Sequence, residues 1–176
     1  MGIIFFDTAI GEMALAIGAS GCLVALSLPE KNRTILRERI EERIGKAVVS
    51  DNYLVSSQLV KRITLHLEGK NQSFSDIDLD WGGIPKLSSF RKSLYEYLKN
   101  NLPAGSTMTY GDVARALGLV AAGGGRAVGQ ALARNPFPLI VPCHRVISSS
   151  GYIGGFTAYR GVILKQWLLQ MEKKCI

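Results

Sequence analysis

The sequence of 176 residues predicts a mixed α/β (α+β) protein with two domains, residues 1–83 and 84–176. In the first domain, short apolar runs separated by turn residues predict a small sheet, and the repeats of leucine and isoleucine that follow predict helices. The second domain shows apolar residues mostly at helical spacing. The break Gly82-Gly83-Ile84-Pro85 interrupts both patterns, and we place the domain boundary there.

The first domain is expected to open with an antiparallel meander, because Gly11 and the turn signal at 18–21 separate three apolar runs. Leucine or isoleucine at every fourth position then predicts amphipathic helices over 33–45 and 56–68. Apolar residues that alternate with acids predict an edge strand over 74–79. The three runs of the meander are 3–6, 13–17 and 23–28.

The second domain is expected to begin with a helix capped by Ser88 or Ser89. Thr109, with Asp112 three positions later, forms a capping pattern that predicts the start of a second helix. A further short helix is predicted over 125–134, after a glycine-rich turn. Two short helices joined by a turn indicate a helix-turn-helix, a pattern shared by DNA-binding proteins and by helical hairpins that bind nothing.

The excess positive charge lies entirely in the second half of the chain. Of the 21 Lys and Arg and the 14 Asp and Glu, residues 1–80 hold nine basic and eleven acidic ones, and residues 81–176 hold twelve and three. The two halves therefore carry net charges of −2 and +9. Such an asymmetry is expected of a domain that meets a polyanion, and equally of a basic surface that keeps a protein in solution.

The three cysteines are odd in number and lack CxxC spacing, which excludes a disulfide scaffold and a zinc finger as leading interpretations. No stretch approaches the ~20 consecutive apolar residues of a membrane-spanning helix, and residues 1–7 lack the basic flank of a signal peptide. We therefore expect a protein in solution, neither secreted nor bound to a membrane. The cysteines are Cys22, Cys143 and Cys175.

The predicted helix over 125–134 has two distinct faces. Val128 and Leu132 lie one turn apart and are expected in the core. The glycines and alanines of this helix allow two interpretations, close approach of its backbone to a DNA groove or tight packing within the protein. The glycine run before it misses the GxGxxG spacing by one residue, so we expect no nucleotide cofactor. The opposite, exposed stripe is formed by Arg126, Gln130 and Arg134, with Ala127 beside them.

Reactive and charged side chains lie next to one another at Pro142-Cys143-His144-Arg145. An apolar strand over 139–141 is expected to run into the proline, which breaks the strand and presents Cys143 at its end. A lone cysteine is usually buried and inert, but positively charged neighbours favour the thiolate, which is the nucleophilic form. Adjacent side chains on an extended segment point to opposite faces, so proton transfer between Cys143 and His144 is expected to pass through water.

Four motifs of the second domain occur together in one known family. They are Pro142-Cys143-His144-Arg145-Val146, Asn135-Pro136, Arg126-Ala127-Val128-Gly129, and Trp167-Leu168-Leu169 with Glu172. Over residues 89–172 the chain therefore resembles the O6-alkylguanine-DNA alkyltransferases (methylated-DNA:protein-cysteine methyltransferases). The first 80 residues share only the order of elements with this family. The resemblance implies a ribonuclease H-like N-terminal domain and a mostly helical, winged-helix-like C-terminal domain with a helix-turn-helix.

The resemblance implies direct-reversal DNA repair in which each protein molecule acts once. Cys143 would attack the alkyl carbon on O6 of guanine and keep the group as a thioether. His144 is implied as the base that deprotonates Cys143 through water, and Glu172 as the carboxylate that orients His144. Asn135 is implied as the hinge between the recognition helix and the active-site strand, and Tyr110 as the phenol that hydrogen-bonds and protonates the leaving guanine.

The resemblance also implies the residues that contact the DNA and the alkylated base. Arg126 would fill the gap left by the flipped nucleotide, from the same DNA-binding helix as Ala127, Gln130 and Arg134. The loop over 151–161 departs from the family, because it has Phe-Thr where a Tyr-Ser pair is usual and is about two residues longer. For the alkylguanine pocket, the resemblance implies Phe156, Thr157 and Tyr159 as walls, Val141 as the source of a backbone carbonyl, and Lys165 as a residue that helps to hold the site together.

The expected partner is double-stranded DNA that contains O6-alkylguanine, bound by a monomer in the cytoplasm or, in a eukaryote, the nucleus. We expect no cofactor and no metal, since zinc-binding members need clustered ligands and the first domain offers only Cys22 and His66. Three alternatives are a helix-turn-helix protein that recognises the lesion without chemistry, a Cys-His hydrolase, and a regulator triggered by alkylation. The presence of Cys143 argues against recognition without chemistry, and a Cys-His hydrolase would leave the basic domain unexplained. A regulator triggered by alkylation needs a cysteine-rich sensor domain, which this sequence lacks.

Overall fold

A computed structural model describes residues 2–45, 49–50, 53–82, 84, 86–119, 122–153 and 155–173. Its contacts divide the chain into two compact units, Met1–Leu87 and Ser88–Ile176. The boundary expected after residue 83 stays a prediction. Four residues singled out in the sequence lie outside the described part, namely Gly83, Pro85, Gly154 and Cys175.

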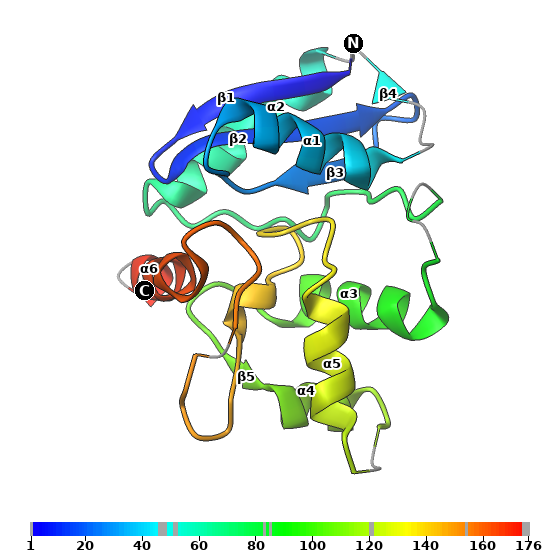
Figure 1. Cartoon of the computed structure of the whole chain (residues 1–176), viewed down its shortest axis with the longest axis vertical. Helices are drawn as coiled ribbons and strands as arrows, with labels where there is room; N and C mark the ends of the chain where they lie inside the picture. The colour runs from blue at the N-terminus through cyan, green and yellow to red at the C-terminus, as the bar shows by residue number, and fades with distance from the viewer. Residues whose placement is uncertain are drawn as a thin grey trace. The chain divides into compact units, whose positions relative to one another are not determined.

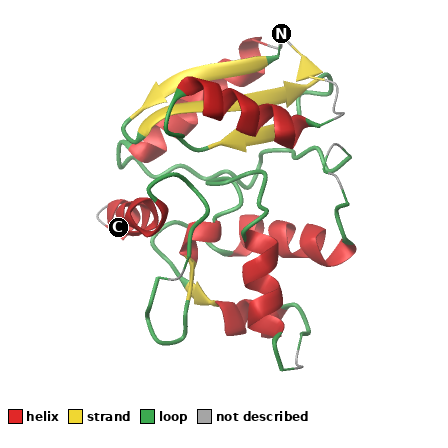
Figure 2. Ribbon diagram, in the orientation of Figure 1, coloured by secondary structure: helices red, strands yellow, loops and turns green. Residues whose placement is uncertain are grey.

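The first unit is built on an antiparallel sheet (Figures 1 and 2). Strands β1 (Ile3–Thr8), β2 (Gly11–Gly18) and β3 (Leu23–Ser27) lie in the order β1-β2-β3, which confirms the predicted meander. A two-residue strand, β4 (Val49–Ser50), pairs with the end of β2. The sequence did not predict β4, because two residues are too few to show an alternating pattern.

Two helices cover the two faces of this sheet. Helix α1 (Arg33–Ile44) begins where Asn32 accepts a hydrogen bond from the backbone N–H of Ile35 at 2.9 Å. Its buried residues pack against alanines of β2 and Val24 of β3. Helix α2 (Tyr53–Leu67) covers the opposite face (Figure 1). Its Leu59 lines the same small cavity as Ile17 of β2. Both helices are confirmed, because an apolar stripe needs a sheet face to cover it.

The predicted edge strand over 74–79 is wrong. Only Leu79 forms a bridge to the sheet, at Leu23, where the backbone N–H of Leu23 donates to Asp78 and that of Asp80 donates to Leu23. The rest of this segment is held by side chains of α2. The Arg62 guanidinium binds both carboxylate oxygens of Asp76 at 2.7 and 2.8 Å. These side-chain contacts replace the ladder of backbone hydrogen bonds that a strand needs.

The second unit is mostly helical (Figure 2). Helix α3 (Ser89–Asn101) is capped by Ser88, as predicted. Thr109 and Asp112 form both hydrogen bonds of a capping box, which confirms the predicted start of α4 (Tyr110–Ala116). Helix α6 (Gly161–Lys173) ends the described chain, and two short strands, β5 (Met108–Thr109) and β6 (Val146–Ile147), pair in parallel. None of the described helices is long and apolar enough to cross a membrane.

Helix α5 (Gly124–Leu132) packs against α4 and is shorter than predicted, because it ends two residues before Arg134. Its N-cap, Gly123, has a φ of 98°, a left-handed conformation that favours glycine. An added Cβ at Gly124 would lie 2.9 Å from the carbonyl oxygen of Leu119, and one at Gly129 would face the ring of Tyr110. Gly124 therefore serves packing within the protein. Gly125 and Gly129 also line a cavity, and the choice between the two interpretations stays a prediction for them.

The apolar patterns of the sequence thus predicted the fold class correctly, a small sheet with helices followed by a mostly helical unit.

The apolar strand predicted over 139–141 is absent from the described structure. Leu139 and Ile140 instead form a tight turn between bridged Pro138 and Val141, and Leu139 has a φ of 71°. The segment is fully enclosed by protein, and its apolar run reflects this burial rather than a place in a sheet.

Candidate active site

Cys143 lies at the first position of a short 3-10 helix, η1 (Cys143–Arg145), directly after this turn. Its residue surface is 8% exposed, so the thiol is enclosed but reachable. Asn135 holds the turn in place, because its side-chain Nδ2 donates to the carbonyl of Val141 at 2.9 Å and its Oδ1 accepts from the N–H of Phe137 at 3.0 Å. Buried amide groups that are satisfied in this way fix a backbone strongly. The sequence therefore placed Asn135 correctly beside the cysteine segment.

His144 points away from solvent and pairs with Glu172, in the last turn of α6. His144 Nε2 lies 2.8 Å from Glu172 Oε1, and both residues are fully buried. Arg145 donates to the same carboxylate through Nε at 2.9 Å and Nη2 at 2.8 Å. Its Nη1 donates to the carbonyl of Leu102 at 2.6 Å. The adjacent residues His144 and Arg145 thus form one enclosed ionic cluster with Glu172, which follows Arg145 by 27 positions.

The cluster fixes the protonation pattern of His144. A carboxylate only accepts hydrogen bonds, so Nε2 of the neutral imidazole carries the proton toward Glu172. The lone pair of the ring then resides on Nδ1, which is also buried. Because Arg145 balances the charge of Glu172, the cluster does not require His144 to be a cation.

Tyr110 and Lys165 lie together near the cysteine. The Lys165 ammonium donates to the carbonyl of Val146 at 2.7 Å and to the Tyr110 hydroxyl at 3.5 Å. Burial, with a further contribution from Cys143, raises the pKa of Tyr110, so its phenol stays protonated at neutral pH. Burial lowers the pKa of Lys165, against an opposing effect of Cys143. Both groups are therefore proton donors beside the sulfur.

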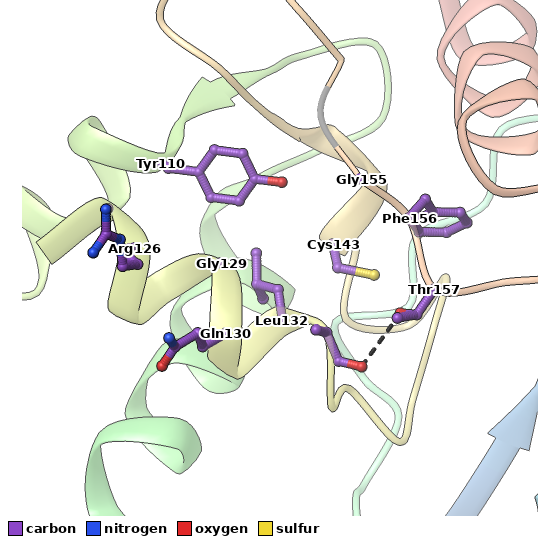
Figure 3. A pocket seen from close by; sticks show the side chains of 11 residues that line it. Tyr110, Arg126, Gly129, Gln130, Leu132, Cys143, Gly155, Phe156 and Thr157 are labelled. Atoms are coloured by element: carbon purple, nitrogen blue, oxygen red, sulfur yellow. Dashed lines mark hydrogen bonds between the residues drawn. The ribbon is translucent and has the colours of Figure 1, made fainter. Parts of the chain in front are cut away.

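A cavity of about 610 Å³ opens over Cys143 (Figure 3). Six residues predicted for the site line it, and Figure 3 shows the phenol of Tyr110 on the α5 side and Phe156 near the sulfur. Its remaining described lining consists mainly of α5. The predicted lining residues are Tyr110, Arg126, Gln130, Cys143, Phe156 and Thr157, and the others are Gly125, Gly129, Leu132, Ala133 and Gly155.

Several predicted pocket residues lie elsewhere. Tyr159 is 44% exposed and is not among the described residues that line the cavity. Lys165 is buried behind Tyr110 rather than in the wall. Val141 is also outside the described lining, and its carbonyl accepts the hydrogen bond from Asn135. Tyr159 is therefore not among the described walls of the cavity, and the roles implied for Val141 and Lys165 stay predictions.

The predicted DNA-binding residues fall on α5 and just beyond it. Arg126 and Gln130 are exposed and also line the cavity, so the helix face and the pocket are continuous. Ala127 is half-buried beside them, and Arg134 is exposed beyond the end of the helix. This places a positively charged, small-residue helix at the mouth of a pocket that contains a thiol.

Sequence reasoning missed two positions. Arg145 appeared only as a charge near Cys143, because no spacing rule links it to a carboxylate 27 residues later. Tyr95 is fully buried, and its hydroxyl donates to the carbonyl of Ala131 in α5 at 2.7 Å. The sequence analysis gave Tyr95 no role, because no local pattern links it to a residue 36 positions later. Among the described residues, no group of three or more His, Cys, Asp or Glu side chains could hold a metal ion.

Comparisons with known proteins agree with this site. A family model described as "6-O-methylguanine DNA methyltransferase, DNA binding domain" matches residues 89–174. A methylated-DNA–protein-cysteine methyltransferase of Thermococcus kodakarensis is 34% identical over 169 residues, which cover 93% of this chain and 91% of that protein. A DNA base-flipping protein of Thermus thermophilus is 43% identical over 110 residues, covering 62% and 68%.

Solved structures show the same likeness over both units. The crystal structure of Mycobacterium tuberculosis OGT in complex with DNA matches with a TM-score of 0.75 and 30% identity, covering 99% of this chain and 94% of that one. The O6-methylguanine-DNA methyltransferase of Pyrococcus kodakaraensis matches with a TM-score of 0.68 and 28% identity, covering 97% of each chain. This chain belongs to the O6-methylguanine-DNA methyltransferase family, the methylated-DNA–protein-cysteine methyltransferases.

Proposed function

We propose that this protein transfers the alkyl group of O6-alkylguanine in double-stranded DNA irreversibly to the sulfur of its own Cys143. One observation carries the proposal. The Cys143 thiol lies in a cavity that is continuous with the exposed Arg126 and Gln130 face of α5. A base that leaves the DNA stack at this face would enter the cavity and meet the sulfur.

The reaction is a displacement at a saturated carbon. The Sγ of Cys143 forms a bond to the alkyl carbon, the bond between that carbon and O6 breaks, and the bonding electrons leave with guanine. The thiolate is the nucleophilic form of cysteine and suits a soft carbon centre. A thioether is stable in water, and none of the cavity-lining residues described here is a second thiol that could remove it. Each molecule therefore acts once. The molecule that acts is a monomer.

The proton inventory balances through two groups. His144 takes the thiol proton, through a water, on the Nδ1 lone pair that its bond to Glu172 leaves available. The departing guanine gains a proton from the Tyr110 phenol, which burial keeps protonated at neutral pH. Asn135 acts as the hinge, since its two hydrogen bonds tie the residues after α5 to the turn before Cys143. No cofactor takes part in this scheme.

The DNA is held by the second unit, in the cytoplasm or, in a eukaryote, the nucleus. Arg126 projects from the exposed face of α5 and would occupy the space left by the extruded nucleotide. Ala127 allows close approach beside it, while Gln130 and Arg134 contact the flanking backbone. Phe156 and Thr157 line the alkylguanine pocket. The net charge of +9 over residues 81–176 supplies the general attraction to phosphates.

Mass spectrometry tests the transfer directly. Wild-type protein is incubated with a duplex that contains O6-methylguanine, and intact protein and its peptides are weighed. We expect one methyl group per molecule, on the peptide that contains Cys143. Cys22→Ala removes a half-buried free thiol of the other unit and is the matched control, which should still gain the methyl group. Cys143→Ala should gain none while it still binds the duplex.

The role of Arg126 is tested with two substrates. In Arg126→Ala, transfer from the duplex should fall more than transfer from free O6-benzylguanine, because the free base needs no flipping. An equal loss with both substrates would assign Arg126 a structural role instead.

A second function, recognition of the lesion without chemistry, is favoured by the similarity to the Thermus thermophilus DNA base-flipping protein. It predicts tight binding to the same duplex with no adduct on the wild-type protein. That outcome would refute the proposed transfer and make Cys143 a structural thiol.

A further inference from the structure

The C-terminal end of α5 is held from outside the helix by three side chains. A helix leaves its last carbonyls without donors from the helix itself, so they must find partners elsewhere. Here the carbonyl of Ala133 accepts from the Thr157 hydroxyl at 3.3 Å, and that of Arg134 accepts from Arg91 Nη2 at 3.3 Å. The carbonyl of Ala131 accepts from the backbone N–H of Arg134 at 3.1 Å and receives a second hydrogen bond from the Tyr95 hydroxyl at 2.7 Å.

Two of these side chains support each other on α3. Tyr95 is fully buried, and its hydroxyl accepts a hydrogen bond from Arg91 Nε at 3.3 Å while it donates to Ala131. The Arg91 guanidinium also lies 5.7 Å from the centre of the Tyr95 ring. One planar cation thus fixes both the orientation of the phenol and the carbonyl of Arg134. Thr157 approaches the helix end from the cavity side, as the dashed line in Figure 3 shows.

The segment held in this way is the wall of the reactive cavity. Leu132 and Ala133 line the cavity, and Asn135, which ties the turn before Cys143, follows directly. The helix has little stability of its own, because three of its nine residues are glycine. Its far end carries Arg126, the residue that would meet displaced DNA. DNA that presses on Arg126 would therefore also displace Leu132 and Ala133, unless other residues hold the end of the helix in place.

We propose that Arg91, Tyr95 and Thr157 form a carbonyl clamp that positions the end of α5 for alkyl transfer. The proposal rests on the proposed function. Arg91 and Tyr95 are positioning residues, since they bind backbone carbonyls at the end of α5, whereas Thr157 binds such a carbonyl and also lines the cavity. The clamp keeps the cavity wall and the Asn135 hinge in fixed positions relative to Cys143 while the damaged nucleotide leaves the DNA stack. Its loss should therefore slow the transfer step at saturating DNA and leave DNA binding unchanged.

The test compares Tyr95→Phe with Tyr97→Phe. Both variants remove one phenolic hydroxyl from α3, but the Tyr97 hydroxyl contacts only the sulfur of Met108 in the described structure, at 3.9 Å. Single-turnover rates are measured over a range of duplex concentrations. In Tyr95→Phe the maximal rate should fall about 5- to 10-fold, as expected for one lost hydrogen bond, with the half-saturating concentration unchanged. Tyr97→Phe should match the wild type in both quantities.

Thr157 gives an independent conservative rescue. Thr157→Val removes the hydroxyl that binds Ala133, and the maximal rate should fall, whereas Thr157→Ser keeps the hydroxyl and should restore most of it. Equal rates for the valine and serine variants would overturn the role of Thr157 in the clamp.

Hydrogen exchange separates the clamp from the proposed function. Backbone amides of the peptide spanning 131–137 should exchange faster in Tyr95→Phe than in the wild type, and at the wild-type rate in Tyr97→Phe. Unchanged exchange in Tyr95→Phe, or a loss of DNA affinity equal to its loss of rate, would overturn the clamp. A wild-type protein that transfers no alkyl group would refute the proposed function alone, because the exchange result does not depend on activity.

Discussion

Replacing Glu172 by glutamine, Glu172→Gln, tests the enclosed ionic cluster. The change keeps the shape of the side chain but removes the negative charge of the carboxylate. That carboxylate accepts hydrogen bonds from Arg145 Nε and Nη2 and from His144. The Arg145 side chain is only 7% exposed and would be left as a buried cation without its carboxylate. Removing one partner of a buried ion pair costs about 3–5 kcal/mol of unfolding free energy. Such a loss is a large fraction of the ~5–15 kcal/mol that stabilises a typical domain.

Urea unfolding measures this loss. Trp167 lies in the second unit and Trp81 in the first, so fluorescence in a Trp81→Phe background follows the second unit alone. With a slope of about 1–2 kcal/mol per molar urea, the midpoint of Glu172→Gln should fall by about 2 M or more. The same protein should also transfer alkyl groups slowly, because the neutral amide of glutamine no longer stabilises the positive charge that His144 gains when it takes the thiol proton.

Glu96→Gln is the matched control. It makes the same chemical change in the same unit, at an exposed pair in which Glu96 lies 3.9 Å from Lys92 and both side chains are 47% exposed. Exposed pairs of this kind contribute only about 0–1 kcal/mol, so the midpoint should hardly move. If Glu172→Gln unfolds at the same urea concentration as Glu96→Gln, the cluster does not stabilise the unit and the reasoning fails.

Three further changes have defined outcomes. Asn135→Ala should lower the unfolding free energy by about 1–3 kcal/mol, because it removes two buried hydrogen bonds of the Asn135 amide, the one to the carbonyl of Val141 and the one from the N–H of Phe137, and a urea midpoint equal to wild type would refute this. Hydrogen bonds from Thr109 and then from Arg115 lower the pKa of Asp112 below 3.8, so its stabilisation is present above that pH and is lost as the pH falls through the folded-state pKa. The midpoint difference between wild type and Asp112→Asn should therefore shrink in acid, and a constant difference would contradict the assignment. Gly124→Ala should destabilise the helix pair by about 1–3 kcal/mol, since its Cβ would meet a backbone oxygen at 2.9 Å, whereas Gly125→Ala, with contacts of 3.4 Å or more, should not; equal thermal midpoints would count against this packing.

Local signals in the sequence predicted the elements that depend on near neighbours. The fourfold repeat of α1 and the Thr109 capping pattern of α4 involve residues three or four positions apart, and both are confirmed. The strands predicted over 74–79 and 139–141 were wrong for a common reason. Their apolar residues are buried by other elements, α2 in the first case and the surrounding second unit in the other, and burial alone does not specify a strand.

The sequence by itself determined the class of the fold, the helices with caps or stripes, and a cysteine flanked by basic residues beside a basic helix. Only the tertiary structure decided that Arg145 and His144 share Glu172, that Gly124 of α5 packs closely against Leu119, and that Tyr95 binds the end of this helix. The physical reason is the range of the interactions. Periods and caps are set within one helical turn, whereas Tyr95 meets Ala131 across 36 positions and Arg145 meets Glu172 across 27, distances along the chain that only packing brings together.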